Sequence, residues 1–193
     1  MAKTKPSEEN KKIARYLAAV FEDKSHVQQY NHDQIDLHIN ILWSPEHPRK
    51  NGFTYYGTIG LSDYVLKGFP HRLEFVGVCM SEFDYFPNIL ATASFIIMRT
   101  GQLYSPGSVM PNVVKEYAPA TKLPHLYFTS PFSWKDKLQE FDLGTKIVNF
   151  LQVVPISESE RLYLEKNGEK KFEDLLEKKL IDVTNMNRDS VVE

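Results

Sequence analysis

The sequence predicts an α+β fold in which helices pack on a mostly antiparallel or mixed sheet. Three observations support this. Apolar residues recur at helical spacing near both ends of the chain, they alternate with polar residues in its middle, and some runs are apolar on both faces, as in covered strands. The order of these segments is not the regular strand–helix alternation of a parallel fold. At 193 residues the chain has the usual size of one domain, so we expect residues 1–193 to form a single domain.

The first expected element is an amphipathic helix over about residues 7–22. Ser7 can accept a hydrogen bond from the opening amides of a helix, and the next two residues are glutamates, which the positive end of the helix dipole favours. An apolar stripe then follows at helical spacing, formed by Ile13, Tyr16, Leu17, Val20 and Phe21.

A change of period after residue 35 predicts strands. Apolar and polar residues alternate over 35–41 and again over 53–59, and the segment between them contains prolines and the pair Asn51-Gly52. This pattern predicts an antiparallel hairpin closed by a long loop. The segment 73–80 is apolar on both faces, which is typical of a central, covered strand.

A nearly uncharged helix is expected over 85–99, with Pro87 in its first turn and Gly101 at its end. Such a helix would cover the core of the sheet. Further strands are expected at 125–129 and 146–156, and the second of these is again apolar on both faces.

The end of the chain is expected to be helical over about residues 157–180. Ser157 and Glu160 have the spacing of a capping box, in which each side chain satisfies an open amide at the start of a helix. Gly168 can end this helix in the left-handed conformation. Apolar residues then mark a second short helix, namely Phe172, Leu175, Leu176 and Leu180.

Composition and charge exclude several classes of protein. The net charge is −2, without the basic excess that neutralising many phosphates requires, so we expect no direct nucleic-acid partner. The start of the chain lacks an apolar segment of signal-peptide length, and Cys79, the single cysteine, has no partner for an internal disulfide. The run 88–98 is too short to cross a bilayer. We therefore expect a cytoplasmic protein with no membrane association.

Residues that could carry catalysis have more economical structural explanations. His32, Asp36 and His38 form the densest set of potential metal ligands, but their spacing matches no zinc motif, and exposed strand positions explain them. Cys79 ends an apolar strand, where a thiol acts as a small hydrophobe. The segment with Gly57 and Gly60 lacks the Lys-Ser/Thr pair of a phosphate loop. These glycines instead indicate a bulge or a close approach of neighbouring backbone. We expect no catalytic residue, cofactor or metal.

An acidic and aromatic group at a strand-to-helix joint is the best candidate for a binding surface. Paired carboxylates can act as acid and base, but they can also attract a basic protein partner, and aromatic side chains suit a protein interface. An ordinary solvated turn is the alternative interpretation. The candidate partner-binding residues are Asp63, Glu82, Phe83, Asp84, Tyr85 and Phe86.

Several segments together resemble the suppressor of fused domain family. The resemblance covers about residue 30 to the end of the chain, and its clearest part is the tail. The matching segments are GTIGLS (57–62), HRLEFVGV (71–78), GQLYSPG (101–107), LPHLYFTSPF (123–132), VNFLQVVPISESERLYLEKNG (148–168) and DVTNMNRDSVV (182–192).

The resemblance implies a suppressor-of-fused-like α+β domain that works as a protein-binding module and has no catalytic residues to transfer. Bacterial single-domain members resemble immunity proteins, and this chain is similar in layout to the Bacillus antitoxins paired with LXG-type nuclease toxins. The resemblance therefore predicts an immunity protein that binds and neutralises a cognate secreted nuclease-type toxin. A regulatory protein-binding adaptor is the alternative. A hydrolase is a further one, either metal-dependent through His32, Asp36 and His38 or using the carboxylates of Glu82 and Asp84.

Overall fold

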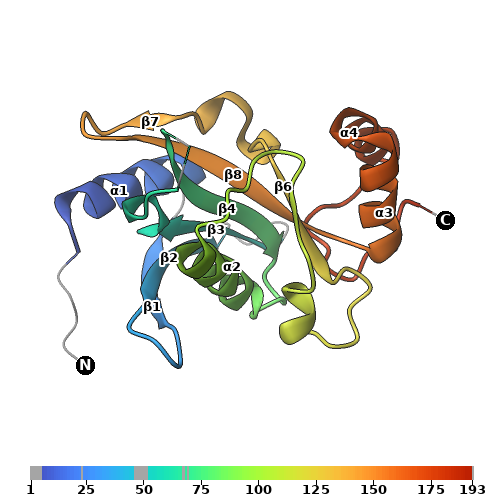
Figure 1. Ribbon diagram of the computed structural model, residues 1–193, viewed down its shortest axis with the longest axis horizontal. Helices are drawn as coiled ribbons and strands as arrows, with labels where there is room; N and C mark the ends of the chain where they lie inside the picture. The colour runs from blue at the N-terminus through green and yellow to red at the C-terminus, as the bar shows by residue number, and fades with distance from the viewer. Residues whose placement is uncertain (1–5, 23, 46–51, 67, 69, 193) are drawn as a thin grey trace.

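A computed structural model describes residues 6–22, 24–45, 52–66, 68 and 70–192, and the structural statements below concern these residues. Within them, an eight-stranded sheet forms the centre of the fold (Figure 1). Its strands lie in the order β1-β2-β3-β4-β8-β6-β5, and β7 pairs with β8. The strands are β1 His26–Asn31, β2 His38–Pro45, β3 Phe53–Ile59, β4 Arg72–Met80, β5 Val109–Met110, β6 His125–Thr129, β7 Phe141–Asp142 and β8 Ile147–Ile156.

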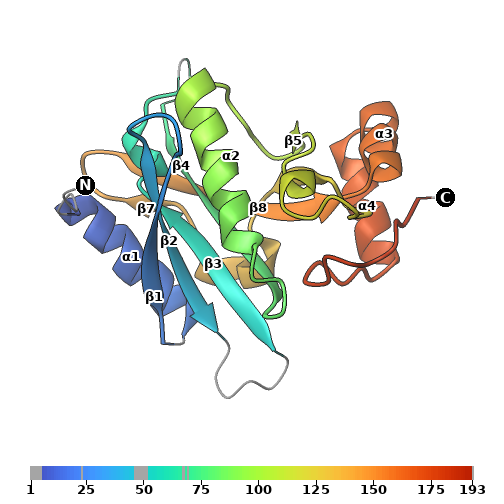
Figure 2. The ribbon, with the colours of Figure 1, turned by 90° about the horizontal axis from the view of Figure 1, so that it is seen from below.

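Helices cover both faces and one end of this sheet. Seen from below, α2 lies across the sheet, with α1 at one end of the molecule and α3 and α4 at the other (Figure 2). No helix in the described part of the chain is both long and apolar enough to span a membrane. The helices are α1 Glu8–Phe21, α2 Phe86–Thr100, α3 Glu158–Asn167 and α4 Glu169–Lys178, and the 3-10 turns are η1 Leu61–Asp63, η2 Val114–Glu116 and η3 Phe132–Lys137.

The predicted fold class is confirmed. The β4–β8 pair is parallel, and the other pairs are antiparallel, so the sheet is mixed. The central position of β4 explains why its sequence is apolar on both faces: residues 73–79 are all buried. The expected hairpin is present as the antiparallel pair β2–β3, and most of its loop, residues 46–51, lies outside the described residues.

Two glycines let helices approach the sheet closely. A Cβ atom at Gly77 would lie 2.6 Å from the ring of Phe86 in α2, and one at Gly57 would lie 2.7 Å from a methyl carbon of Leu17 in α1. The close approach expected at Gly57 is therefore made by a side chain and not by backbone. Gly57 pairs with Val76, the residue before Gly77, and neighbouring positions of a strand point to opposite faces of the sheet. Helices α1 and α2 therefore pack on opposite faces.

The helix ends largely follow the sequence predictions. Ser7 accepts a hydrogen bond from the amide of Asn10, and Ser157 and Glu160 form the complete capping box. Gly101 ends α2 with a φ of 64°, in the left-handed region. Gly168 has a positive φ of 85°, but its ψ of 163° is extended, so it does not adopt the left-handed helical conformation that we expected. Gly168 is the single residue between α3 and α4.

Three strands and one strand start were missed, and two of these strands, β5 and β7, have only two residues each. The strand predicted from about residue 35 begins only at His38, and an unpredicted strand, β1, precedes it. Five of the six β1 residues are exposed, so β1 shows no alternation of apolar and polar residues that sequence reasoning could detect. Residues 32–37 reverse the chain between the two strands.

A buried ion pair fastens the segment after α4 to the rest of the molecule. Both carboxylate oxygens of Glu160 accept hydrogen bonds from the guanidinium of Arg188, at 2.6 and 3.0 Å. Arg188 also donates to the carbonyl oxygen of Pro155 in β8, and Glu160 accepts from the amide of Val191. Neighbouring Met186 is buried in the main core. The C-terminal segment is therefore an integral part of the domain.

Candidate binding site

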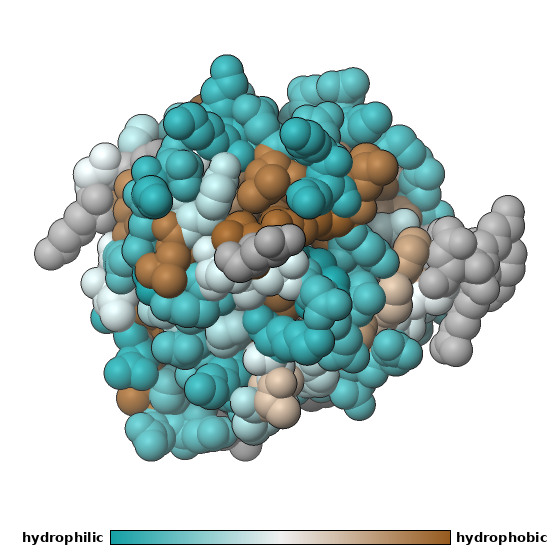
Figure 3. All heavy atoms as spheres, turned by 90° about the vertical axis from the view of Figure 1, so that its right-hand side faces the viewer, coloured by the Kyte–Doolittle hydropathy of each residue, from teal (hydrophilic) through white to brown (hydrophobic). Residues whose placement is uncertain are grey.

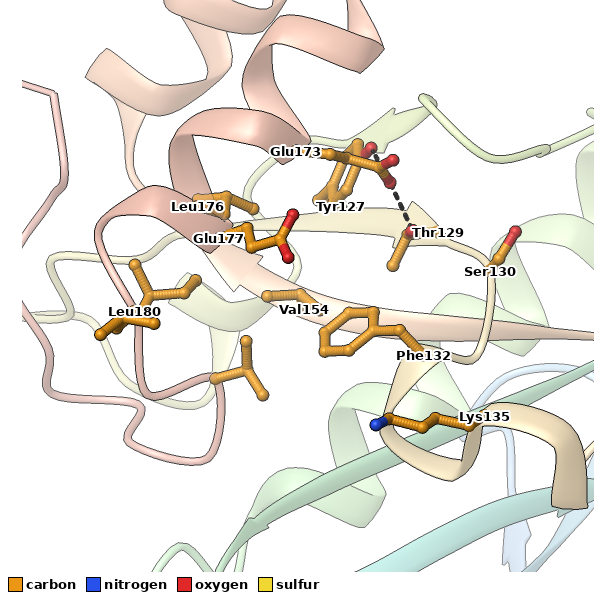
Figure 4. A pocket seen from close by; sticks show the side chains of 12 residues that line it. Tyr127, Thr129, Ser130, Phe132, Lys135, Val154, Glu173, Leu176, Glu177 and Leu180 are labelled. Carbon is orange, nitrogen blue, oxygen red and sulfur yellow. Dashed lines mark hydrogen bonds between the residues drawn. The ribbon is translucent and has the colours of Figure 1, made fainter.

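A groove opens between α4 and η3, on the face of the sheet that α1 also covers. Val154 of β8 forms part of its floor, and its side chain points to the same face as Phe150, which packs in one core cluster with Ile13 and Leu17 of α1. The cavity has a volume of about 550 Å³, within the range of roughly 300–1,000 Å³ that ligand pockets occupy. We call it the α4–η3 groove (Figure 4).

The packing of α4 on the sheet creates one wall of this groove. Phe172 is fully buried, with its ring edge-to-face against Tyr127 of β6 at a centroid distance of 5.2 Å. One turn later, Leu176 lines the groove. The first turn of α4 lies against the turn at Gly107, where a Cβ atom would be 2.8 Å from Oε2 of Glu169. These contacts hold α4 so that Glu173 and Glu177, which follow Phe172 and Leu176 in the chain, lie along the rim of the groove.

The carboxylate of Glu173 is held in one orientation. Its Oε1 atom accepts hydrogen bonds from the hydroxyl of Tyr127 at 3.0 Å and from that of Thr129 at 2.6 Å. Burial, followed by the negative charge of Glu173, raises the pKa of Tyr127 well above its usual value, so its hydroxyl remains a donor. Glu177 lies beside Glu173 on the α4 side, and Lys135 faces them from η3 (Figure 4). The groove thus combines an apolar floor with charged edges.

Two residues that flank the groove have unusual backbone conformations. Lys135 has a φ of 43° and a ψ of −122°, and Leu180, just after α4, has a φ of 49°. Non-glycine residues with such angles cost on the order of 1–3 kcal/mol each and persist only where the surrounding structure imposes them. The Leu180 side chain is 87% exposed, and Phe132 on the opposite wall is 49% exposed. Large apolar side chains are therefore exposed to solvent on both sides of the groove.

The acidic and aromatic residues singled out in the sequence do not form one surface. Glu82 and Asp84 are exposed and Tyr85 is half-buried, but Phe83 and Phe86 are buried in the core between α2 and the sheet. Their apolar rings fill the core because the start of α2 must pack on β4. Within this segment, only the side chains of Glu82, Asp84 and Tyr85 are therefore open to a partner.

Asp63 lies at the other end of the sheet from this segment. Phe53 pairs with Met80, so the start of β3 lies beside Glu82, whereas Asp63 follows the end of β3. Its carboxylate accepts hydrogen bonds from Asn10 at 2.8 Å and from Lys146 at 2.7 Å. Asp63 joins α1 to the turn before β8, and the expectation that it lies beside Glu82 and Asp84 is wrong.

The histidine group is also divided by the fold. His32 and Asp36 lie in the turn between β1 and β2, whereas His38 begins β2, so the expectation that exposed strand positions explain all three residues is wrong. The ring of His32 packs edge-on against Phe95 of α2, and its Nδ1 accepts a hydrogen bond from the amide of Gln34. Among the described residues, no three His, Cys, Asp or Glu side chains are arranged to hold a metal ion.

Cys79 is fully buried in the core on the α2 face. Burial raises the pKa of its thiol to about 12, with a smaller opposing effect of the Tyr56 hydroxyl. The thiol is therefore protonated at neutral pH, whereas a cysteine nucleophile must ionise. This environment matches the expectation of a small core hydrophobe.

Comparison with known proteins identifies the family. The family model described as "Suppressor of fused protein (SUFU)" matches residues 33–189. The chain belongs to the SUFU family. A curated relative, "Immunity protein YqcF" of Bacillus subtilis (strain 168), is 37% identical over 190 residues, covering 96% of this chain and 98% of that protein.

Solved structures of the SUFU family share the fold. A putative SUFU homolog from Neisseria gonorrhoeae FA 1090 has a TM-score of 0.76 at 17% identity, covering 95% of this chain and 97% of that one. A chain of the Sufu–Fu complex has a TM-score of 0.68 at 18% identity, with coverages of 97% and 93%. Drosophila Suppressor of Fused has a TM-score of 0.66 at 17% identity, with coverages of 93% and 50%.

Sequence reasoning missed the α4–η3 groove, although one signal was present. Glu169, Glu173 and Glu177 recur at intervals of four residues, which places them in a row along one side of a helix. The sequence indicates that α4 has an acidic row beside its apolar stripe. It does not indicate that η3 faces that row across an open floor.

Proposed function

We propose that this protein is a cytoplasmic immunity protein that binds and neutralises a cognate secreted toxin through protein–protein contact. The observation that carries the proposal is the 37% identity to a protein named as an immunity protein, over nearly the full length of both chains. The SUFU family match over residues 33–189 includes both Glu160 and Arg188, which hold the C-terminal segment. We further propose that the toxin is of the nuclease type, related to the LXG toxins.

The surface of the protein supports such a role. A nuclease must be basic where it holds phosphates, and acidic side chains on an inhibitor speed and orient docking to a basic surface. Glu82 and Asp84 at the end of β4 and the acidic rim of the α4–η3 groove offer carboxylates to such a partner. The net charge of −2 is compatible with this sign of attraction.

The test is neutralisation of the toxin encoded beside the gene for this chain. The toxin's catalytic domain is expressed from an inducible promoter, alone or together with this protein, and colony survival is counted. We expect survival to be restored only with this protein, and the two chains to co-purify. Unchanged killing together with no co-purified complex would refute the proposed function.

A second measurement tests the nuclease assignment. Purified toxin domain is incubated with plasmid DNA and with total RNA while this protein is titrated in. We expect one nucleic acid to be degraded, and the cleavage to stop near a one-to-one ratio of the proteins. A toxin that binds this protein but cleaves neither substrate would overturn the nuclease assignment and leave the immunity role standing.

A further inference from the structure

The α4–η3 groove leaves an apolar surface exposed that the fold itself does not cover. Val154, Leu176 and Val183 line it, and Leu180 and Phe132 project on either side with exposed fractions of 87% and 49%. Apolar side chains gather on the face that bears the C-terminal helices, surrounded by hydrophilic ones (Figure 3). Apolar patches rimmed by polar residues mark interaction sites on soluble proteins.

The exposure of Leu180 favours a protein over a small molecule as the occupant. A small ligand within the cavity would leave most of the Leu180 side chain in water. A protein surface that inserts a side chain between α4 and η3 would also cover Leu180 and Phe132 at the edges. Such an arrangement, an anchor in a pocket surrounded by contacts that exclude water, is typical of the centre of a protein interface.

The charges at the rim specify the chemistry of that anchor. Both hydrogen bonds to Glu173 reach its Oε1 atom, and its Oε2 atom accepts none among the described residues. Glu177 lies one turn further along α4, and its side chain extends into the groove (Figure 4). Two carboxylates on the α4 side face one ammonium group, that of Lys135, on the η3 side. A positive group is therefore favoured on the α4 side.

The fixed orientation of Glu173 adds to this preference. A carboxylate that is already held by Tyr127 and Thr129 loses little freedom when it binds a cation. The planar guanidinium of arginine matches a carboxylate with two parallel hydrogen bonds, and its stem can lie on apolar surface. The groove thus suits a side chain that is apolar along its length and basic at its tip, or an apolar residue next to a basic one.

We propose that the α4–η3 groove binds the toxin by receiving an apolar side chain and an adjacent Arg or Lys, which pairs with Glu173 and Glu177. This inference rests on the proposed function and adds the contact surface and the chemistry of the partner. It also assigns the main contact to the C-terminal helices, and not to the segment Glu82–Phe86 at the start of α2.

Binding of purified variants to the toxin's catalytic domain, inactivated by an active-site substitution, tests the inference. Glu177→Lys reverses a rim charge, and Leu180→Asp places a charge in the apolar edge. Both residues are exposed, so the variants should fold, which circular dichroism and a thermal melt verify. We expect each variant to raise Kd by at least about tenfold, because each introduces a charge that the interface does not match, and such mismatches are costly. Glu177→Lys should also slow association most strongly at low salt.

Matched controls make the same chemical changes away from the groove. Glu116→Lys alters an exposed carboxylate on η2, and Val27→Asp alters an apolar residue, 54% exposed, on edge strand β1. These variants should bind within about twofold of wild type, as surface substitutions outside an interface do. A charge-reversal screen of the toxin's Arg and Lys residues should then yield a substitution that restores binding of Glu177→Lys.

The outcomes separate the two proposals. If wild type binds the toxin and both groove variants bind equally well, the groove inference is overturned while the proposed function stands. Loss of binding in Glu82→Lys/Asp84→Lys alone would likewise overturn it and assign the contact to that segment. If wild-type protein does not bind the toxin, both proposals fail.

Discussion

Removal of the buried Arg188 side chain should destabilise the whole domain. Glu160 is fully buried and Arg188 is 8% exposed. The Glu160 carboxylate accepts two hydrogen bonds from Arg188 and two from the amides of Ser157 and Val191. In Arg188→Met, the carboxylate keeps only the two amide donors, and its charge loses the opposite charge that compensates it.

The magnitude follows from this change. Removing one partner of a buried ion pair costs about 3–5 kcal/mol because the other charge stays buried without compensation. Typical domains are stable by only about 5–15 kcal/mol, so about a fifth or more of the free energy of unfolding is at stake. The loss should affect global stability, since the tail that Arg188 holds also buries Met186 in the main core and accepts a hydrogen bond from the amide of Met80.

Urea unfolding followed by tryptophan fluorescence measures the effect. Trp134 is buried in a different core cluster from the one that Met186 of the tail enters, so its fluorescence reports unfolding beyond the tail itself. The double variant Glu160→Gln/Arg188→Met removes the uncompensated charge, so it should lose less than the sum of the two single variants, with a coupling of about 0.5–3 kcal/mol. A loss below about 1 kcal/mol in Arg188→Met, or strict additivity, would refute the reasoning.

Two further predictions concern the core. Gly77→Ala should destabilise the protein by about 1–3 kcal/mol, because its methyl group meets the packed ring of Phe86, and it should cost more than Gly57→Ala, which meets a flexible end of Leu17; equal losses in urea unfolding would contradict this. Burial, partly opposed by hydrogen bonds, raises the pKa of Glu74 above 4.5, so the native state holds its proton to higher pH than the unfolded state. The contribution of Glu74 to stability should then fall as pH rises from about 4.3 to the raised native pKa. Measured between pH 4 and 9, Glu74→Gln should therefore gain stability relative to wild type as pH rises, and a difference that shifts the other way would contradict it.

The elements with a distinct apolar period could be predicted from the sequence. The stripe of α1, the runs of β4 and β8 with apolar residues on both faces and the capping box of α3 each reflect local rules, and all four elements are present. Strand β1 could not be predicted, because its side chains are mostly exposed and it is held by backbone pairing with β2. Backbone hydrogen bonds leave no signature in the order of side chains.

The arrangement of the candidate site residues could be predicted from the sequence even less than the strands could. Phe83 and Phe86 look like interface aromatics in the sequence, but the fold places them in the core. Asp63 lies 19 residues before Glu82 in the chain, yet the antiparallel pairing of β3 with β4 carries it to the opposite end of the sheet. Burial and proximity depend on how strands pair, which spacing along one segment does not encode.

The sequence by itself determined the α+β class, the central strands, most of the helix ends and the lack of a recognisable catalytic motif, because these depend on neighbouring residues and on composition. Only the tertiary structure decided that Glu160 finds Arg188, and that the acidic row of α4 faces η3 across Val154 to form the α4–η3 groove. Such contacts join residues far apart in the chain, and they arise when the sheet and its covering helices bury their apolar surfaces together.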